Sequence, residues 1–600
     1  MQTNDFTPAP GCADNVIEND RLSRPLLTPG LTPQIASCSS CENIGVPRVY
    51  SVVNALFKRL SHMRSKIIER SSRGWRPLTP FPLVGVWLFF AFILGGCATL
   101  PTDYPRVHSE AIRDTENTRI GRGVAPLLVE QTGKSGFFSL GNGLDAFVAR
   151  LALAQGADRT LDVQYYLFHD DATGRLFAGS LMQAADRGVR VRLLLDDMDM
   201  GGRDAGLSAV SQHPNIEIRL FNPFPSRGMR FLNFLTHFGT VTRRMHNKSF
   251  TVDNQVTIVG GRNIGDEYFE AAAGANFGDM DVLAIGPVVQ DVSTAFDRYW
   301  NSELAVPVTA LDVGDVDGLI ERARERLAAD LDALPDSTYG QRLRESDITK
   351  RLETRDLDFF WGPARLLYDL PEKVLTEPED RTTHLGPELG ELLTSVQSDL
   401  ILVSPYFVPG RQGTELLRSL VERGCRVTVL TNSLAATDVP AVHAGYARYR
   451  RALIEAGIEI YEMQPSKPAY DAGRSRLGES QASLHAKTIV FDQERVLVGS
   501  MNLDPRSSLL NTEMGILIDS PKLASAISDW RDQRLTEVAW RVDLEQAAVT
   551  DFPVGNEKQL VWISLEGGRE MRRYDREPES GLWARIQAAL LRLLPIERQL

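Results

Sequence analysis

The sequence predicts an α/β protein of two duplicated halves, each a mixed, mostly parallel β-sheet flanked by helices, with one active site shared between them. The first observation behind this is a repeated pattern of His, Lys and Asp, which is followed after six residues by a segment with Gly and Asn. The second is that strands and helices alternate in the same order around both copies. The copies are His246–Lys248–Asp253 with Gly260–Asn263, and His485–Lys487–Asp492 with Gly499–Asn502.

Length and composition are those of a folded protein. The chain has 600 residues, of which 43% are hydrophobic and 24% are charged, which is enough for a sizeable core. The net charge of −12 argues against a general nucleic-acid binder, because such proteins carry a basic face.

The sequence of the N-terminal region indicates a signal for export of the protein and not a folded domain. Residues 1–62 have no sustained hydrophobic periodicity, so we expect them to be disordered or to lie upstream of the true start. Residues 63–96 contain a basic run and then an apolar run, Phe81–Leu94, which ends at Gly95-Gly96-Cys97. This order resembles the signal peptide of bacterial lipoproteins, in which the Cys becomes acylated, so Cys97 is the expected lipid anchor. The alternative is an uncleaved membrane anchor, although the apolar run is short for a full span.

The first half is expected at 136–305, after a tether at 97–135. Its strands are predicted at Leu161–Phe168, Val189–Leu195 and Ile216–Leu220, with a helix at Gly174–Arg187 between the first two.

The second half, expected at 386–545, repeats that order. Leu400–Phe407 corresponds to the first strand, and Thr488–Phe491 is a buried strand directly after His485 and Lys487. Between the halves, 306–385 is charged and predicts a helical linker. The tail, 546–600, ends with an amphipathic stretch at Leu582–Leu594, which suits a helix docked on the body or one lying on a lipid surface.

The repeated motif resembles the signature of the phospholipase D superfamily, and the sequence around His246 is similar to bacterial cardiolipin synthases of the C type. The second copy matches the signature fully, through Gly499-Ser500-Met501-Asn502. The first copy departs from it at Gly261, which stands where the signature has Ser. The resemblance covers roughly residues 135–600 and implies phosphodiester chemistry through a covalent phosphohistidine.

These residue types suit that chemistry. Lys248 and Lys487 can neutralise the phosphoryl oxygens, and Asn263, Asn502 and the hydroxyl of Ser500 can donate hydrogen bonds to them. One His attacks phosphorus and the other protonates the leaving group. The resemblance implies that His246 is the nucleophile and His485 the acid, although the near symmetry leaves the reverse assignment open. The mechanism requires no metal and no cofactor, and we expect none.

Carboxylates complete the predicted site. Asp279 and Glu513 are expected to orient the two imidazoles. Asp253 and Asp492 belong to the catalytic motif, but we expect them to hold strand-end geometry rather than to touch substrate. The remaining histidines of the body that lack such a motif are expected at the surface or at helix ends: His169, His213, His237 and His443.

The resemblance implies a phosphatidyltransferase that makes cardiolipin from phosphatidylglycerol, either alone or together with phosphatidylethanolamine, and leaves the identity of the donor open. A hydrolytic phospholipase D, a nuclease and a lipoprotein that only binds lipid are the alternatives, and the acidic charge disfavours the nuclease. The expected partners are phospholipids and a membrane rather than nucleic acid. The expected location is the cell envelope, with the catalytic body in the periplasm, and the oligomeric state is open.

Overall fold

The computed structural model describes most of the chain after Leu100. The described residues are 100, 103–228, 230–272, 276–311, 316–354, 357–465, 482–546, 558–566, 569–594 and 597–600. The predictions for 1–62, for the signal peptide at 63–96 and for the lipid anchor Cys97 therefore lie outside the described residues.

The first sheet has nine strands among the described residues. In spatial order they are β10 (Phe360–Gly362), β1 (Ser135–Leu140), β8 (Asp281–Ile285), β6 (Val256–Gly260), β5 (Ser249–Val252), β2 (Thr160–Tyr165), β3 (Arg190–Asp196), β4 (Ile216–Phe221) and β9 (Ala305–Pro307).

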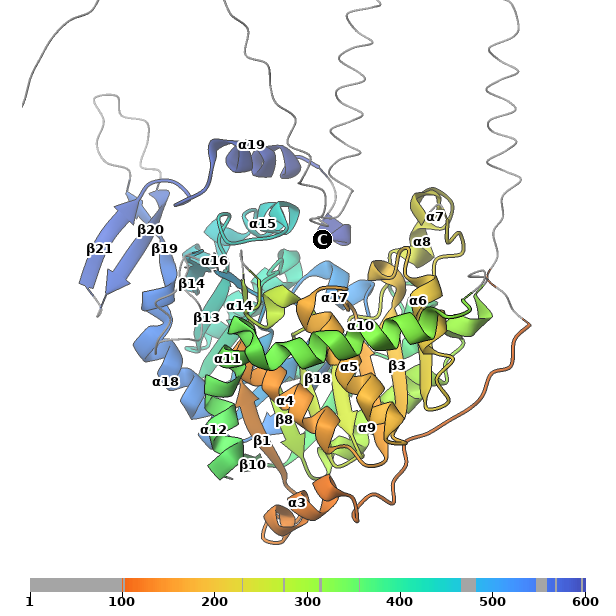
Figure 1. The fold of residues 1–600 in the computed structure, drawn as a ribbon. Helices are drawn as coiled ribbons and strands as arrows, with labels where there is room; N and C mark the ends of the chain where they lie inside the picture. Colours follow the sequence, from red (N-terminus) through yellow and green to blue (C-terminus); the bar gives the residue numbers. More distant parts are fainter. Residues whose placement is uncertain are drawn as a thin grey trace, which may run out of the picture. The chain divides into compact units, whose positions relative to one another are not determined.

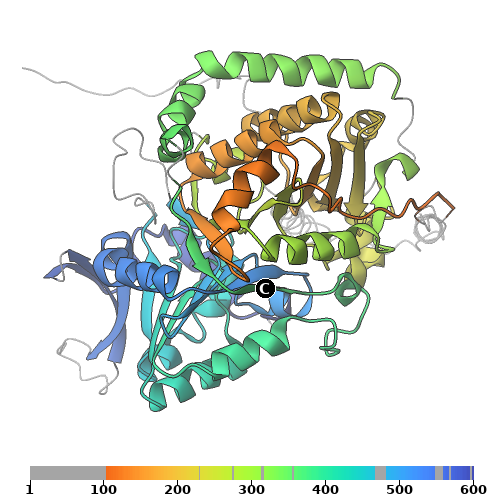
Figure 2. The same cartoon turned by 90° about the horizontal axis from the view of Figure 1, so that it is seen from below.

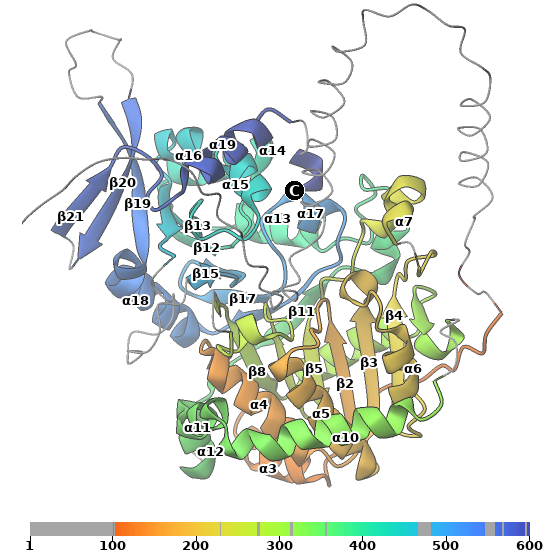
Figure 3. The same ribbon diagram turned by 45° about the horizontal axis from the view of Figure 1, so that its top comes forward.

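The second sheet repeats this arrangement with ten described strands, and Figure 3 shows the two sheets in separate lobes. In spatial order they are β11 (Ala364–Tyr368), β18 (Met514–Asp519), β17 (Arg495–Gly499), β16 (Thr488–Phe491), β12 (Asp399–Val403), β13 (Arg426–Asn432), β14 (Glu459–Met463), β19 (Ala539–Gln546), β20 (Lys558–Glu566) and β21 (Arg569–Tyr574). The run from β1 to β9 in the first sheet matches the run from β11 to β19 in the second, which confirms the predicted duplication.

The sheets are mixed, as predicted, but the prediction that they are mostly parallel is wrong. In the described part of each sheet, parallel pairing joins three strands, β2–β3–β4 and β12–β13–β14, and the other neighbours are antiparallel. Parallel neighbours need a long crossover, which the helices after β2 and β12 provide. The motif strands instead turn back in tight hairpins at Asp253–Asn254 and Asp492–Gln493, where φ is positive.

Helices cover the outer faces of the sheets (Figure 1). In the first half and the linker they are α3 (Arg119–Leu128), α4 (Gly143–Gly156), α5 (Ala172–Asp186), α6 (Asp204–Val210), α7 (Arg230–Thr236), α8 (Phe238–Val241), α9 (Val288–Trp300), α10 (Leu319–Ala333), α11 (Thr338–Glu345) and α12 (Asp347–Thr354). In the second half and the tail they are α13 (Gly386–Thr394), α14 (Gly410–Glu422), α15 (Pro440–Tyr446), α16 (Arg450–Glu455), α17 (Pro505–Leu509), α18 (Pro521–Val538) and α19 (Leu582–Leu591).

One apolar core joins the halves, which Figure 2 shows as neighbouring lobes. It combines Val259 of β6 and Val282 of β8 with Val490 of β16, Val498 of β17 and Ile516 of β18. Each of these side chains contributes about 1.5–3 kcal/mol to the stability of the fold when it is buried between the sheets and not exposed. The edges that carry the two motifs are therefore fixed against each other.

The linker region carries strands as well as helices. After α10, α11 and α12, the strand β10 joins the edge of the first sheet and β11 joins the edge of the second. The chain therefore passes from one sheet to the other within a few residues.

Candidate active site

The segments that lead into β5 and β16 each pair with the opposite half. The backbone N–H of His246 donates to the carbonyl of Thr512 at 2.9 Å, and that of His485 donates to the carbonyl of Gly278 at 2.7 Å. Just before His485, the short strand β15 (Ala482–Leu484) pairs in parallel with β7 (Asn276–Gly278) of the first half. The halves thus exchange backbone hydrogen bonds at both histidines.

This exchange gives each imidazole a carboxylate from the other half. His246 Nδ1 lies 2.8 Å from Glu513 Oε2, and His485 Nδ1 lies 2.6 Å from Asp279 Oδ2. Both carboxylates are fully buried, and both histidines are less than a tenth exposed. With Nδ1 held in this way, Nε2 of each ring is left for chemistry.

The two lysines lie beside the histidines. Lys248 Nζ donates to the carbonyl of His246 at 2.5 Å, and Lys487 Nζ donates to the carbonyl of His485. Lys487 Nζ also lies 2.8 Å from His485 Nδ1, so it competes with Asp279 for that ring nitrogen. Lys248 interacts electrostatically with Glu513, Lys487 and Asp279.

Burial sets the protonation of this cluster. It lowers the pKa of His246 to about 4 and that of His485 well below its usual value, so both rings are neutral at pH 7. Burial also lowers the pKa of Lys248 to about 7 and that of Lys487 to about 8. Burial acts to raise the pKa of Glu513, but the charge and hydrogen bond of His246 lower it on balance. A bound phosphate would favour protonation of the lysines and histidines.

Asp253 and Asp492 lie outside this cluster. Asp253 accepts backbone N–H groups of Asp158, Arg159 and Thr160 at 2.7–3.0 Å. Asp492 accepts the backbone N–H groups of residues 397–399 at 2.7–3.2 Å. Both therefore cap the start of the neighbouring strand. These contacts are the ones that the strand-end role requires, and a part for either aspartate in catalysis stays a prediction.

Donation from Ser500 to substrate stays a prediction, and the structure pairs its hydroxyl with groups of the protein. Its hydroxyl donates to Glu513 Oε2 at 2.6 Å and accepts the backbone N–H of Met514 at 3.1 Å. Ser500 therefore supports the carboxylate that holds His246. In the first half, a Cβ on Gly261 would lie 2.7 Å from Asp279 Oδ2, so the carboxylate fills the space that a Ser side chain would need.

The two asparagines are buried and differ in their partners. Asn263 Nδ2 donates to the hydroxyl of Tyr268 at 2.9 Å, and its Oδ1 accepts the backbone N–H of Leu167 at 3.2 Å. Asn502 Oδ1 is buried and has no hydrogen-bond partner among the described residues. An unpaired amide oxygen of this kind can accept a hydrogen bond from a ligand hydroxyl.

Aromatic residues that sequence reasoning missed flank both rings. Tyr166 lies edge-on to His246 with ring centroids 5.0 Å apart, and Tyr268 lies edge-on to His485 at 5.2 Å. Phe277 also packs against His485, at 5.3 Å. The position of Tyr166 at the end of the predicted first strand could have indicated it, because site residues gather at strand ends in such sheets.

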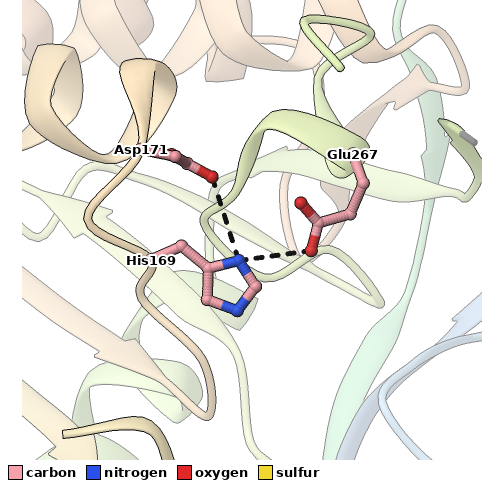
Figure 4. Close-up of side chains that lie close together, drawn as sticks. All are labelled: His169, Asp171 and Glu267. Carbon is pink, nitrogen blue, oxygen red and sulfur yellow. Dashed lines mark ion pairs between the residues drawn. The ribbon is translucent and has the colours of Figure 1, made fainter. Parts of the chain in front are cut away.

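A separate polar cluster lies after β2. His169 Nδ1 lies 3.3 Å from Glu267 Oε1 and 3.8 Å from Asp171 Oδ2 (Figure 4). Burial acts to lower the pKa of His169, but these carboxylates raise it overall. Asp171 also caps α5 by accepting the backbone N–H of Gly174. The cluster is thus an ion-pair network at the helix start.

The expectation of surface or helix-end positions holds for His237, which precedes α8, and for two buried histidines that lie at helix ends. His443 lies in the last turn of α15, is buried, and has its Nε2 3.1 Å from Glu577 Oε1. His213 is buried and lies 3.1 Å from Asp186. Ion pairing with tertiary neighbours allows both to be buried.

The chain is similar to several known proteins. The family model described as "Cardiolipin synthase, PLD-like domain" matches residues 150–300 and 389–535. Cardiolipin synthase C of Escherichia coli is 42% identical over 482 residues, which cover 80% of this chain and 99% of that protein. A cardiolipin synthase of Oceanobacillus iheyensis is 26% identical and covers 64% of this chain and 67% of that protein. Among solved structures, phosphatidylserine synthase of Haemophilus influenzae gives a TM-score of 0.47 at 15% identity and covers 70% of this chain and 91% of that chain.

The matched segments contain both motifs, and the similarity to the Escherichia coli protein extends over nearly its whole length. The chain belongs to the cardiolipin synthase family with phospholipase D-like domains.

Proposed function

We propose that the protein is a phosphatidyltransferase that makes cardiolipin from phosphatidylglycerol through a phosphohistidine. The observation that carries this proposal is the pair of buried histidines, each held at Nδ1 by a carboxylate of the opposite half, with a lysine beside each. The similarity to a cardiolipin synthase over 99% of its length supports the lipid substrate.

In the first step, neutral His246 attacks the donor phosphorus through Nε2, and the bond from phosphorus to the leaving alkoxide breaks. Protonated His485 gives its proton to that alkoxide, which leaves as an alcohol. In the second step, His485 takes the proton of the acceptor hydroxyl, whose oxygen attacks phosphorus and releases His246. Glu513 stabilises the positive charge that His246 acquires.

The lysine beside His485 supplies a means of protonating it. Lys487 Nζ and Asp279 Oδ2 both lie against His485 Nδ1. A bound phosphate attracts the ammonium of Lys487, which leaves Nδ1–H to Asp279 and favours the imidazolium. Substrate binding would therefore convert His485 into the acid that the first step needs.

The test is incubation of the purified protein with phosphatidylglycerol, with and without phosphatidylethanolamine, followed by separation of the lipids. Cardiolipin as the product supports transfer, and phosphatidic acid alone would instead establish hydrolysis. The His246→Ala variant is the control for contaminating activity, and cleavage of DNA by the intact protein but not by this variant would favour a nuclease.

We also infer that the protein works at a membrane of the cell envelope, with Cys97 as its lipid anchor and its body in the periplasm. Among the described residues, no helix has the length and apolar character needed to span a bilayer. Helix α19 packs on Leu434 and Ala444 through Ala588 but leaves Trp583 72% and Leu590 61% exposed. It lies at the same end of the molecule as α7 and α8 (Figure 1), which expose Phe231 and Phe238. Such an apolar surface suits the lipid interface.

Vesicle flotation tests this surface. In protein that starts at Ala98, and so lacks the anchor, Leu590→Asp should reduce binding to phosphatidylglycerol vesicles. Ala589→Asp places the same charge on an exposed neighbour of the same helix and should have little effect. Equal binding by both variants would exclude α19 from the membrane contact.

A further inference from the structure

The second half contains a cavity beside the active site. It has a volume of about 430 Å³ and lies between α13, the start of α14 and the loop that leads into α17. This volume falls within the usual range for a small-molecule site, about 300–1,000 Å³. Its wall is mainly apolar and includes Leu389, Leu393, Phe407, Leu417, Met501 and Leu503.

The polar groups that line this cavity belong to Arg381, Arg411, Gln412, Asn502, Asp504 and Ser508. Asn502, whose buried Oδ1 has no partner in the described part of the chain, forms part of the wall. Asn502 also belongs to the second phosphate-binding motif. Arg381 and Arg411 line the cavity and are exposed, so positive charge lies where it meets solvent.

The cavity is close to a catalytic lysine. A much smaller cavity of about 10 Å³ shares the side chains of Leu389 and Met501 with it and is lined by Lys487 as well. A ligand whose phosphate lies between the two motifs could therefore extend an apolar chain past Asn502 into the larger cavity.

We propose that this cavity holds an acyl chain of the phospholipid substrate. The inference rests on the proposed function and makes it more specific, because it assigns recognition of the lipid tail to the second half. A chain of methylenes would replace water along the leucine and phenylalanine walls, and each buried methylene contributes to binding. Longer acyl chains should therefore react faster at low lipid concentration.

Gly390 offers a way to fill the cavity without disturbing the fold. It lines the cavity in the interior of α13, and a Cβ added there would meet no atom within 4 Å among the described residues. Replacing a helical Gly also removes an entropic cost of folding. The Gly390→Phe variant should therefore fold normally and place its ring in the space of the acyl chain.

The matched control is Gly123→Phe in α3, where an added Cβ likewise meets no described atom within 4 Å. We expect Gly390→Phe to lower kcat/KM for dioleoyl phosphatidylglycerol by about tenfold or more, and to change that for dihexanoyl phosphatidylglycerol and for bis(4-nitrophenyl) phosphate by less than about twofold. Gly123→Phe should resemble the wild type on all three. Equal losses by Gly390→Phe on all three substrates, or no loss on the dioleoyl lipid, would overturn the assignment.

A second measurement does not depend on turnover. Phosphatidylglycerol with a photoreactive group at the end of an acyl chain should crosslink to peptides of α13 and α14 in the wild type, and much less in Gly390→Phe. Crosslinks confined to other segments would overturn the assignment. A protein that crosslinks in the cavity yet forms no cardiolipin would instead retain the tail site and refute the proposed function.

Discussion

The two halves share the same order of strands, but they differ in the segments that follow the corresponding strands β2 and β12. In the first half, Phe168 is followed by the polar cluster of His169, Asp171 and Glu267 (Figure 4). In the second half, the corresponding Phe407 lines the apolar cavity. Both phenylalanines form the same kind of bridge to the segment after the motif asparagine, Phe168 to Ile264 and Phe407 to Leu503. Duplication therefore preserved the frame, while the adjoining surfaces diverged into one charged wall and one apolar wall.

The surroundings of the histidines diverge as well. Glu513, which holds His246, is supported by Ser500, whereas Asp279, which holds His485, occupies the space above Gly261. The aromatic rings described beside both histidines, Tyr166 and Tyr268, come from the first half. A transfer reaction needs one nucleophile and one acid, and this asymmetry allows two equivalent histidines to take different roles.

The largest expected effect separates those roles. His246→Ala and His485→Ala should each lose nearly all activity on natural lipid, at least about 1,000-fold, because both steps need both groups. On a nitrophenyl phosphodiester, whose leaving group needs little protonation, His485→Ala should still form phosphohistidine and accumulate it. Mass spectrometry after quenching without acid measures this adduct.

His246→Ala is the matched comparison, and it should show neither a burst of nitrophenol nor an adduct. A phosphoryl group found on His485 in this variant would reverse the two roles. Absence of an adduct in both variants would point to direct attack by the acceptor.

The next effect tests the different supports of the two carboxylates. A Ser side chain at Gly261 would displace Asp279 and misplace His485, so Gly261→Ser should lower kcat by about 100-fold. The double variant Gly261→Ser with Asp279→Glu recreates the combination of Ser500 and Glu513 found in the second half and should recover part of the loss. In the second half, Ser500→Gly removes one hydrogen bond to Glu513 and should lower kcat by about tenfold. A Gly261→Ser enzyme with wild-type kcat would show that the site tolerates movement of Asp279.

Local sequence patterns predicted much of this molecule. The strand Thr488–Phe491 appears at the predicted residues, because β-branched and aromatic residues in a short run favour a buried strand. The crosswise pairing of Glu513 with His246 arises from contacts between residues 267 positions apart, which no local pattern specifies. The partner of Ser500 and the antiparallel pairing of most neighbouring strands likewise depend on tertiary packing.

The dependence of kcat/KM on pH should report the protonation of the two lysines, Lys248 in the first half and Lys487 in the second. Burial lowers the pKa of Lys248 to about 7 and that of Lys487 to about 8, so both lose their charge as the pH rises through this range. Because the charged forms bind phosphate, kcat/KM should fall above about pH 7 and more steeply above about pH 8, by up to about tenfold per pH unit for each lysine that titrates. The acid limb should come only near pH 4, where His246 becomes protonated. A profile that stays flat to pH 10 would show that the lysines remain charged in the free enzyme.

The smallest expected effect on catalysis concerns the motif aspartates, which differ in burial between the halves. Asp253 is fully buried and Asp492 is partly exposed, and each caps backbone N–H groups of the adjacent strand. Asp253→Ala should lower the free energy of unfolding by about 2–4 kcal/mol, since three N–H groups lose an acceptor in bonds that are buried or part-buried. Asp492→Ala should cost about 1–2 kcal/mol, because water can replace the carboxylate.

The Asn variants are the matched controls for these aspartates. Both positions have positive φ, which Asn tolerates better than Ala, and the amide oxygen keeps one acceptor. Asp253→Asn and Asp492→Asn should therefore be more stable than the Ala variants in denaturant titrations. The kcat of the folded fraction should stay within about twofold of the wild type in all four, because a carboxylate that caps a strand start takes no part in proton transfer. A loss of kcat at full stability in any of them would return the aspartates to the catalytic residues.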